Sequence, residues 1–235
     1  MDKVAYITGG SKGIGLGIAE AMLRKNMKVA ITGRNQASLD AAAAYLAKVD
    51  GGEILTIQSD VRDLAEEKAA IAKVIETWGR LDVCIANAGV GKFASIEDMS
   101  ADDWNAIIDI NLTGVFHTVK ACIPALKETK GYIMTIASLA GTNFFQNGSA
   151  YNASKFGLVG FTQAIMLDLR KYGIKVTTIM PGSVATHFNE HTPSDADAWK
   201  IQPEDLGQIV IDLLEMHPRT LPSKVEVRPS VPPSK

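Results

Sequence analysis

Residues 4–24 read VAYITGGSKGIGLGIAEAMLR. The stretch begins with a short run of apolar and β-branched residues, continues through a glycine-rich turn at residues 9–15, and ends in a segment where Ile14, Ile18 and Met22 recur every four residues. An apolar repeat of that spacing predicts a helix with one apolar face. A strand, a glycine turn and a helix in this order predict a phosphate-binding site, because the first N–H groups of the helix have no partner within it.

Short β-branched runs alternate with helix-period segments along the rest of the chain, which predicts βαβ units and a parallel sheet. The expected strands are Val4–Thr8, Val29–Thr32, Ile54–Gln58, Val83–Ala86, Tyr132–Ile136, Val176–Met180 and Val225–Val227. Seven such strands predict an α/β, doubly wound sheet with helices on both faces, in a single domain over residues 1–235.

Two helices and one loop are expected around the chemistry. Ser100 is an expected N-cap, with acidic residues in the turn that follows it. A long helix is expected over Tyr151–Tyr172, ending at Gly173. The polar segment 187–202 contains a proline and Ser/Asp-rich turns, and is expected to be a mobile loop over the substrate.

Composition narrows the classes of partner. The net charge of −2 over 235 residues supplies no basic field for a nucleic acid, and no polybasic tract indicates a membrane surface. Cys84 and Cys122 lie in apolar runs and are expected to be buried, and no spacing of ligands indicates a metal site. With no signal-peptide pattern at the start, a reduced, cytoplasmic protein is expected.

Further short motifs follow the glycine turn in a fixed order. They are Asp60-Val61, Asn87-Ala88-Gly89, Asn111, Ser138, Tyr151, Lys155 and Pro181-Gly182-x-Val184-x-Thr186. Together with the spacing Thr-Gly-x-x-x-Gly-x-Gly at residues 8–15, this series resembles the short-chain dehydrogenase/reductase family over essentially the whole chain, and is similar to the 3-oxoacyl-carrier-protein reductases in the glycine-loop and catalytic segments.

The resemblance implies a nicotinamide dinucleotide and the residues that hold it. These are Gly9, Ser11, Lys12, Gly13, Ile14, Gly15, Arg34, Asp60, Val61, Asn87, Ala88, Gly89, Tyr151, Lys155, Pro181, Gly182, Val184 and Thr186. Asp60 is expected at the adenine, and Asn87 is expected to hold its strand against the cofactor. The alternatives are that Asp60 caps a helix and that Asn87 only forms a turn.

The end of the second strand indicates which dinucleotide is used. Gly33 stands where relatives that use NAD tend to carry an aspartate, and Arg34 follows it; Lys12 is a second cation in the glycine loop. Two cations without a carboxylate suit the 2'-phosphate of NADP(H). The alternative is that both cations are solvated loop charges.

Tyr151 and Lys155 are four residues apart and share one face of the expected helix. An ammonium beside the phenol is expected to favour the phenolate, and so to lower a tyrosine pKa of about 10. Ser138 is placed to hydrogen-bond the substrate oxygen. Asn111 resembles the residue that relays protons to the lysine through water.

The sequence therefore predicts an NADP(H)-dependent oxidoreductase that interconverts a carbonyl and a secondary alcohol, with Tyr151 as general acid/base. Candidate substrates are 3-oxoacyl thioesters, 3-hydroxy acids and small ketones. The residues expected to shape the pocket are Leu139, Asn143, Phe144 and the segment His187–Trp199. The alternative is a regulator that senses NADP(H) without turnover. By resemblance, and because apolar residues exceed one stripe between Trp104 and Phe116 and between Phe156 and Leu169, a homo-oligomer is expected, a tetramer or a dimer.

Overall fold

A computed structural model describes residues 2–232, so residues 1 and 233–235 of the expected domain lie outside the described part. Seven strands form one sheet in the order β3-β2-β1-β4-β5-β6-β7, and each neighbouring pair is parallel. The strands are β1 (Val4–Thr8), β2 (Lys28–Gly33), β3 (Ile54–Gln58), β4 (Val83–Ala86), β5 (Tyr132–Ile136), β6 (Lys175–Pro181) and β7 (Lys224–Val227). The predicted doubly wound sheet is confirmed.

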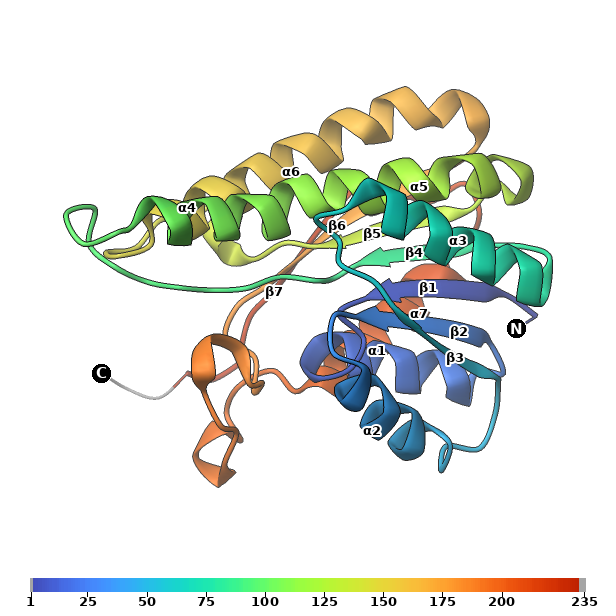
Figure 1. Ribbon diagram of the computed structural model, residues 1–235, viewed down its shortest axis with the longest axis horizontal. Coiled ribbons are helices and arrows are strands. Elements are labelled where there is room, and N and C mark those ends of the chain that lie inside the picture. The colour runs from blue at the N-terminus through green and yellow to red at the C-terminus, as the bar shows by residue number, and fades with distance from the viewer. Residues whose placement is uncertain (1, 233–235) are drawn as a thin grey trace.

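Helices cover both faces of this sheet (Figure 1). One face packs α1 (Gly13–Arg24), α2 (Gln36–Leu46) and α7 (Pro203–Glu215). The other packs α3 (Leu64–Trp78), α4 (Ala101–Ile108), α5 (Gly114–Thr129) and α6 (Ser149–Leu169). Both sides of β1 are therefore buried, which explains why polar residues do not alternate with apolar ones along it.

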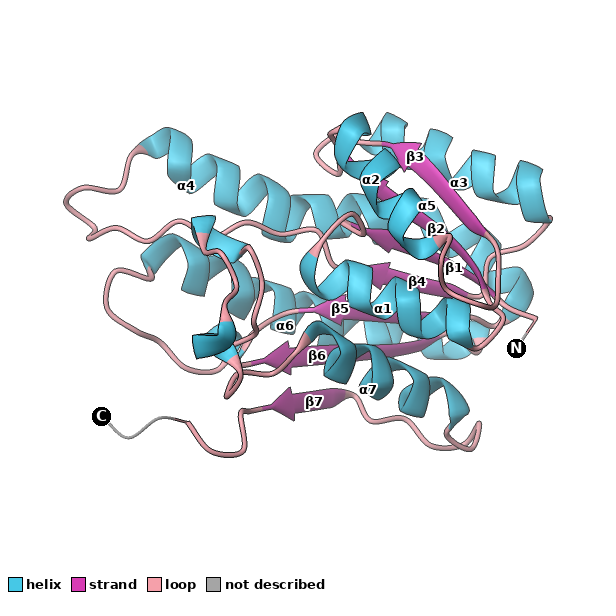
Figure 2. Cartoon of the chain, turned by 90° about the horizontal axis from the view of Figure 1, so that it is seen from below, coloured by secondary structure: helices cyan, strands magenta, loops and turns pink. Residues whose placement is uncertain are grey.

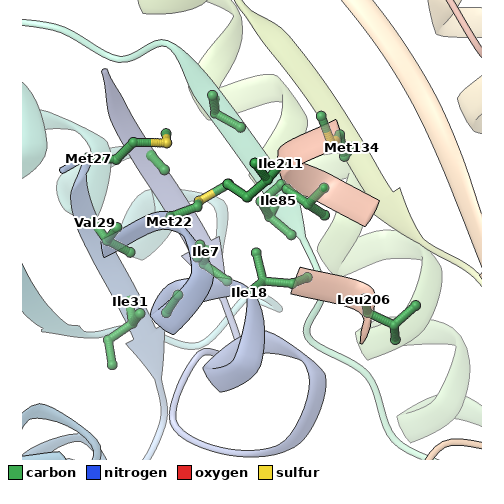
Figure 3. Packing of buried hydrophobic residues seen from close by; sticks show 14 of the residues in the cluster. Ile7, Ile18, Met22, Met27, Val29, Ile31, Ile85, Met134, Leu206 and Ile211 are labelled. Carbon is green, nitrogen blue, oxygen red and sulfur yellow. The ribbon is translucent and has the colours of Figure 1, made fainter. Parts of the chain in front are cut away.

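The predicted apolar face of α1 packs on the sheet. Ile18 and Met22 are fully buried, and they lie with Ile211 of α7 over Ile7 of β1 (Figure 3). The backbones of α1 and α7 come into direct contact, because a Cβ added to Gly207 would lie 2.7 Å from the carbonyl oxygen of Gly17. Two glycines thus let the last helix of the chain dock on the first.

On the opposite face, α4 and α5 are joined by a π-helical turn, η1 (Asp109–Thr113). The continuous helical stretch Ala101–Thr129 is long and apolar enough to cross a membrane by length and composition alone, with a mean hydropathy of 1.3 over its most apolar 18 residues. Half of that window is buried inside the protein. The stretch contacts α3, α6 and the sheet, so its buried apolar residues serve packing in the fold.

The expected helix ends agree closely with the structure. The Ser100 side chain accepts a hydrogen bond from the backbone N–H of Asp103 and caps α4. A 3-10 turn (Arg170–Tyr172) follows α6, and Gly173 ends it at φ +74°. All the strands point toward the edge where the loops after β4, β5 and β6 gather (Figure 2). In an open parallel sheet that edge is where ligands bind, and the strand order reverses there between β1 and β4.

Candidate active site

The glycine turn after β1 lies directly against the end of β4. Gly9 has a φ of +65°, and a Cβ at this position would lie 2.9 Å from Cα of Ala88. Nδ2 of Asn87 donates to the carbonyl oxygens of Thr8 (2.9 Å) and Gly9 (3.1 Å). Asn87 therefore links the glycine loop to the end of β4. The alternative that it only forms a turn does not account for these two hydrogen bonds.

Thr8 begins the glycine motif, but the sequence analysis predicted no role for it. Its Oγ1 accepts hydrogen bonds from the backbone N–H groups of Asn87 and Ala88, both at 3.1 Å. The signal available was its position as the last residue of β1, directly before the glycines.

The motif after β6 meets the start of α1. The backbone N–H of Gly182 donates to Val227 of β7 at 2.8 Å, which fixes the end of β6. Thr186 then lies beside Gly13, because a Cβ at Gly13 would be 3.3 Å from Cγ2 of Thr186. Gly13 has a φ of +57°, as the turn into α1 requires. Segments 9–15 and 181–186, 166 residues or more apart in sequence, thus share one site.

The predicted adenine residues are held by local contacts. The carboxylate of Asp60 binds the guanidinium of Arg62, with Nε at 3.0 Å from both oxygens, and this hydrogen bonding lowers the pKa of Asp60. The cap of α3 is Asp63, which accepts from Ala65 and Glu66, so Asp60 is not the capping residue. Val61 is buried, and its carbonyl oxygen lies 3.0 Å from Nδ1 of His117.

The two cations expected at the 2'-phosphate are exposed at the same edge of the sheet. Lys12 is the N-cap residue of α1, and Arg34 follows β2. Gly33 has room for a side chain, since the nearest atom to an added Cβ is Oγ of Ser11 at 3.6 Å. Neither strain nor crowding explains a glycine at this position.

Ser138, Tyr151 and Lys155 come together beyond the end of β5. Tyr151 and Lys155 lie in the first two turns of α6, with Nζ of Lys155 5.7 Å from the centre of the Tyr151 ring. Nζ also donates to the carbonyl oxygen of Ile136 at 3.0 Å. Ser138 accepts a hydrogen bond from the N–H of Ala140 at 3.1 Å, and its hydroxyl also bonds to Tyr151.

Burial shifts the pKa of Tyr151 upward, whereas the sequence analysis expected a lowered pKa. Removal from water raises the pKa of Tyr151 to about 12, although the hydrogen bond between Tyr151 and Ser138 acts the other way. Burial also lowers the pKa of Lys155 to about 8. Both shifts have the same cause, since a buried site disfavours the charged form of either residue. The expectation that Lys155 lowers the pKa of Tyr151 is therefore wrong for the protein by itself.

Asn111 lies in the π-helical turn and is fully buried. Its Oδ1 accepts from the N–H of Val90 at 2.8 Å, while its Nδ2 donates to the carbonyl of Val90 at 2.9 Å and to Ser154 at 3.1 Å. A Cβ at Gly89 would lie 3.3 Å from Oδ1 of Asn111 and 3.8 Å from Nζ of Lys155. Asn111 thus fixes the segment beside the lysine, and its role in relaying protons stays a prediction.

Aromatic rings from three loops lie in a row with Tyr151. The ring centre of Phe93 is 5.5 Å from that of Tyr151 and 5.4 Å from that of Phe145. The ring centre of Phe188 is 5.6 Å from that of Tyr151. Phe144, which the sequence suggested for the pocket, is 86% exposed and forms none of these ring contacts. Loop geometry selects its neighbour Phe145 instead, a choice that two adjacent phenylalanines do not reveal.

The loop 187–202 contains its own ion pairs. Asp197 is buried and bonds to Nε2 of His191 at 2.6 Å and to Nζ of Lys200, which hold its pKa far below the usual range. A β-bridge joins Ile201, near the end of the segment, to Val184, which lies just before it. The mobility of this loop stays a prediction. Within residues 2–232, no group of three or more His, Cys, Asp or Glu side chains is placed to hold a metal ion.

Comparison with known proteins gives the family. The family model for short chain dehydrogenases matches residues 3–197. The chain belongs to this family. An uncharacterized oxidoreductase of Staphylococcus saprophyticus is 32% identical over 229 residues, which cover 97% of both chains. The family and this relative together identify the chain as an oxidoreductase.

Solved structures agree with the fold over the whole chain. An alcohol dehydrogenase from the archaeon Thermococcus sibiricus, complexed with 5-hydroxy-NADP, superposes with a TM-score of 0.93 at 27% identity, covering 100% of both chains. A metagenomic short-chain oxidoreductase in complex with NADP superposes with a TM-score of 0.85 at 32% identity, covering 98% of both.

Proposed function

We propose that this short-chain dehydrogenase interconverts a carbonyl and a secondary alcohol with NADP(H), and that Tyr151 transfers the proton. One observation carries the proposal: Ser138, Tyr151 and Lys155 meet at the carboxyl edge of the sheet, on the same edge as the glycine loop. A regulator that only senses the cofactor has no need of a buried tyrosine hydroxyl bonded to a serine.

The residues present fit a dinucleotide. Gly9 and Gly15 leave no room for a Cβ, which would lie 2.9 Å from Cα of Ala88 and 2.5 Å from the carbonyl oxygen of Gly9, respectively. The backbone therefore turns tightly and presents the free N–H groups of the first turn of α1 to a pyrophosphate. Lys155, beside Gly89, is placed to hold a ribose hydroxyl of the nicotinamide half.

When bound, the nicotinamide supplies a hydride to a carbonyl carbon or accepts one from an alcohol carbon. In reduction, the hydroxyl of Tyr151 gives its proton to the carbonyl oxygen, so that the alcohol forms and a phenolate remains to be reprotonated from water. The high pKa of Tyr151 keeps it protonated before that step. Ser138 donates a hydrogen bond to the same oxygen and stabilises its developing charge.

Cofactor choice follows from the end of β2. The NADP found with the metagenomic relative and the 5-hydroxy-NADP found with the archaeal alcohol dehydrogenase both carry a 2'-phosphate. In this chain Lys12 and Arg34 are exposed cations near that end of the sheet, and Gly33 brings no carboxylate. These features support NADP(H) over NAD(H).

The test is whether a panel of ketones makes the NADPH absorbance fall. The Tyr151→Phe variant should lose a factor of roughly 10² to 10⁴ in kcat, as expected for general acid catalysis, and still bind NADPH. NADPH binding without turnover of any ketone would favour the regulator. A variant that keeps more than about a tenth of kcat would assign the proton to another residue.

We also propose that the protein is a homo-oligomer, a tetramer or a dimer. The helices α4, α5 and α6 form one layer over the sheet (Figure 1). This layer carries large apolar side chains that are exposed. These are Trp104, Phe116, Phe156 and Leu167, which are 38%, 42%, 43% and 60% exposed. A second copy of the same helical layer would cover them in an isologous contact.

A further inference from the structure

The candidate site has an apolar wall that the proposed chemistry does not use. Phe145, Phe93, Tyr151 and Phe188 form a continuous row of rings, each in contact with the next, at centre distances of 5.4, 5.5 and 5.6 Å. Tyr151 is 9% exposed, whereas the three phenylalanines are 36–44% exposed. The row therefore presents exposed phenyl surface next to the proton-transfer residue.

Each phenylalanine is held by its own loop. The ring of Phe188 sits on Gly91, where a Cβ would be 2.3 Å from Cε1 of that ring. The N–H of Phe145 donates to Oδ1 of Asn152 at 3.4 Å. Asn152 also donates to the carbonyls of Ala140 and Asn143, at 2.7 and 2.8 Å. The rings are thus prearranged, which reduces the entropy lost when a ligand packs on them.

The segment bearing Phe93 is tied to the one bearing Phe145. The N–H of Ala94 donates to the carbonyl of Asn147 at 3.0 Å, and a β-bridge joins Ala94 to Gly148. The edge-to-face contact between Phe93 and Phe145, at an interplanar angle of 78°, belongs to this junction.

The charges in the same loops do not favour an anionic substrate. Segment 139–148 contains no charged residue. Lys92, next to Phe93, binds Asp103 of α4 at 2.7 Å, and Lys200 binds the buried Asp197. These two ammonium groups thus already have carboxylate partners. A carboxylate or phosphate on the substrate would find open phenyl surface here instead of a cation.

We propose that Phe93, Phe145 and Phe188 form an aromatic clamp that selects a neutral ketone bearing an aryl or similarly bulky apolar group beside the carbonyl. The carbonyl lies at Tyr151 and Ser138, and the apolar group packs against the clamp. This inference rests on the proposed function and names its substrate class. It favours neutral ketones over 3-hydroxy acids and carrier-bound thioesters.

The experiment compares three ketones with NADPH: acetophenone, the smaller 2-butanone, and 4-acetylbenzoate, which adds a carboxylate to the aryl ring. Acetophenone should have the highest kcat/KM. Loss of a packed phenyl ring should lower kcat/KM for acetophenone about 10-fold or more in Phe93→Ala and in Phe188→Ala, mainly through KM. The value for 2-butanone should change less than about threefold, because the proton-transfer group is intact.

Two further variants distinguish loss of the aromatic clamp from a general disruption of the site. Gly91→Ala should act like Phe188→Ala, since the added methyl group displaces the Phe188 ring from its seat. Phe144→Ala is the matched control, because Phe144 lies in the same loop but is 86% exposed and outside the row. This control variant should leave kcat/KM unchanged for all three ketones.

The outcomes distinguish the two proposals. If no ketone is reduced although NADPH binds, the proposed function fails, and the clamp with it. If ketones are reduced but 4-acetylbenzoate or 2-butanone equals acetophenone, or if Phe144→Ala matches Phe93→Ala, the clamp alone is overturned.

Discussion

Nζ of Lys155 donates a hydrogen bond to the carbonyl oxygen of Ile136 at 3.0 Å, so the lysine of α6 is tied to the last residue of β5. The amine is buried, and this lowers its pKa to about 8. The protein therefore holds a lysine whose charge changes close to neutral pH, next to the residue that transfers the proton.

This relationship predicts a pH dependence of cofactor binding. Lys155 is an ammonium below about pH 8 and a neutral amine above it, and the ammonium is the stronger donor to a ribose hydroxyl. The Kd for NADPH, measured by fluorescence, should rise as the pH rises through about 8. In the Lys155→Met variant the Kd for NADPH should be higher, and its rise near pH 8 should be absent. A Kd that stays flat from about pH 7 to about pH 9 in the wild type would contradict the assignment.

Cofactor selection predicts the effect of a double substitution. Gly33→Asp with Arg34→Ala removes a cation and adds a carboxylate that repels the 2'-phosphate and accepts the 2'-OH of NADH. Hydrogen bonds to charged groups contribute about 1.5–3 kcal/mol each, which is tenfold or more in affinity. The wild type should favour NADPH by at least an order of magnitude in kcat/KM, and the double variant should lose or invert the preference.

The control for this pair is Arg24→Ala, which removes an exposed arginine that pairs with Glu20 at the far end of α1. It should leave the ratio of the two cofactors unchanged. Equal use of both cofactors by the wild type would mean that Lys12 and Arg34 do not select.

A buried carboxylate away from the site predicts pH-dependent stability. Glu67 of α3 is fully buried and accepts hydrogen bonds from Tyr6 (3.0 Å), Ser59 (2.7 Å) and Thr118 (2.7 Å). Burial is the main cause that raises its pKa, against the three hydrogen bonds. In the unfolded chain a glutamate has a pKa of about 4.3. Above that pH the folded state binds more protons than the unfolded chain, because the pKa of Glu67 is raised in the folded state. The contribution of Glu67 to stability therefore falls as the pH rises above about 4.3.

Urea unfolding of Glu67→Gln tests this. Relative to the wild type, the variant should gain stability as the pH rises from about 4 to about 7, because an amide carries no charge to bury. The exposed Glu128→Gln serves as the control and should track the wild type. A difference between Glu67→Gln and the wild type that does not change with pH would show that the carboxyl is not the cause.

The exposed apolar face predicts the behaviour of an assembly variant. Phe116→Asp with Leu167→Asp places charges on the outer face of α5 and α6, where burial against a second copy would be costly. Light scattering should show the wild type as a tetramer or dimer and the variant as a smaller species. Ile96→Asp, at a residue 73% exposed on another loop, should not change the mass. A wild type that is monomeric at micromolar concentration contradicts the proposal.

Residue pattern predicted the fold well because the sheet is governed by local periodicity. The strands differ from expectation by one residue at most at either end, as in β2, which begins at Lys28 rather than Val29 and ends at Gly33 rather than Thr32. Ladder hydrogen bonds, which the sequence does not display, decide those last residues. The meeting of Ser138 with Tyr151 followed only from the resemblance.

Other features of the site depend on tertiary contacts and could not be predicted from the sequence. The sign of the pKa shift of Tyr151 depends on how many atoms exclude water from it, and the helical spacing of Lys155 carries no such information. The row of Phe93, Phe145 and Phe188 unites three loops separated by more than 40 residues each. Cytoplasmic location and the mobility of the loop 187–202 stay predictions.

The contact between Gly17 and Gly207 has a consequence for how the protein is made. The glycine loop that begins the cofactor site is complete within the first 15 residues, yet the outer side of α1 is covered only when α7 docks on it. During synthesis at about 5–20 residues per second, the nascent α1 must wait on the order of ten seconds or more for residue 207 to appear. A ribosome-bound chain stopped before α7 should therefore expose the apolar side of α1 to chaperones and fail to retain NADPH.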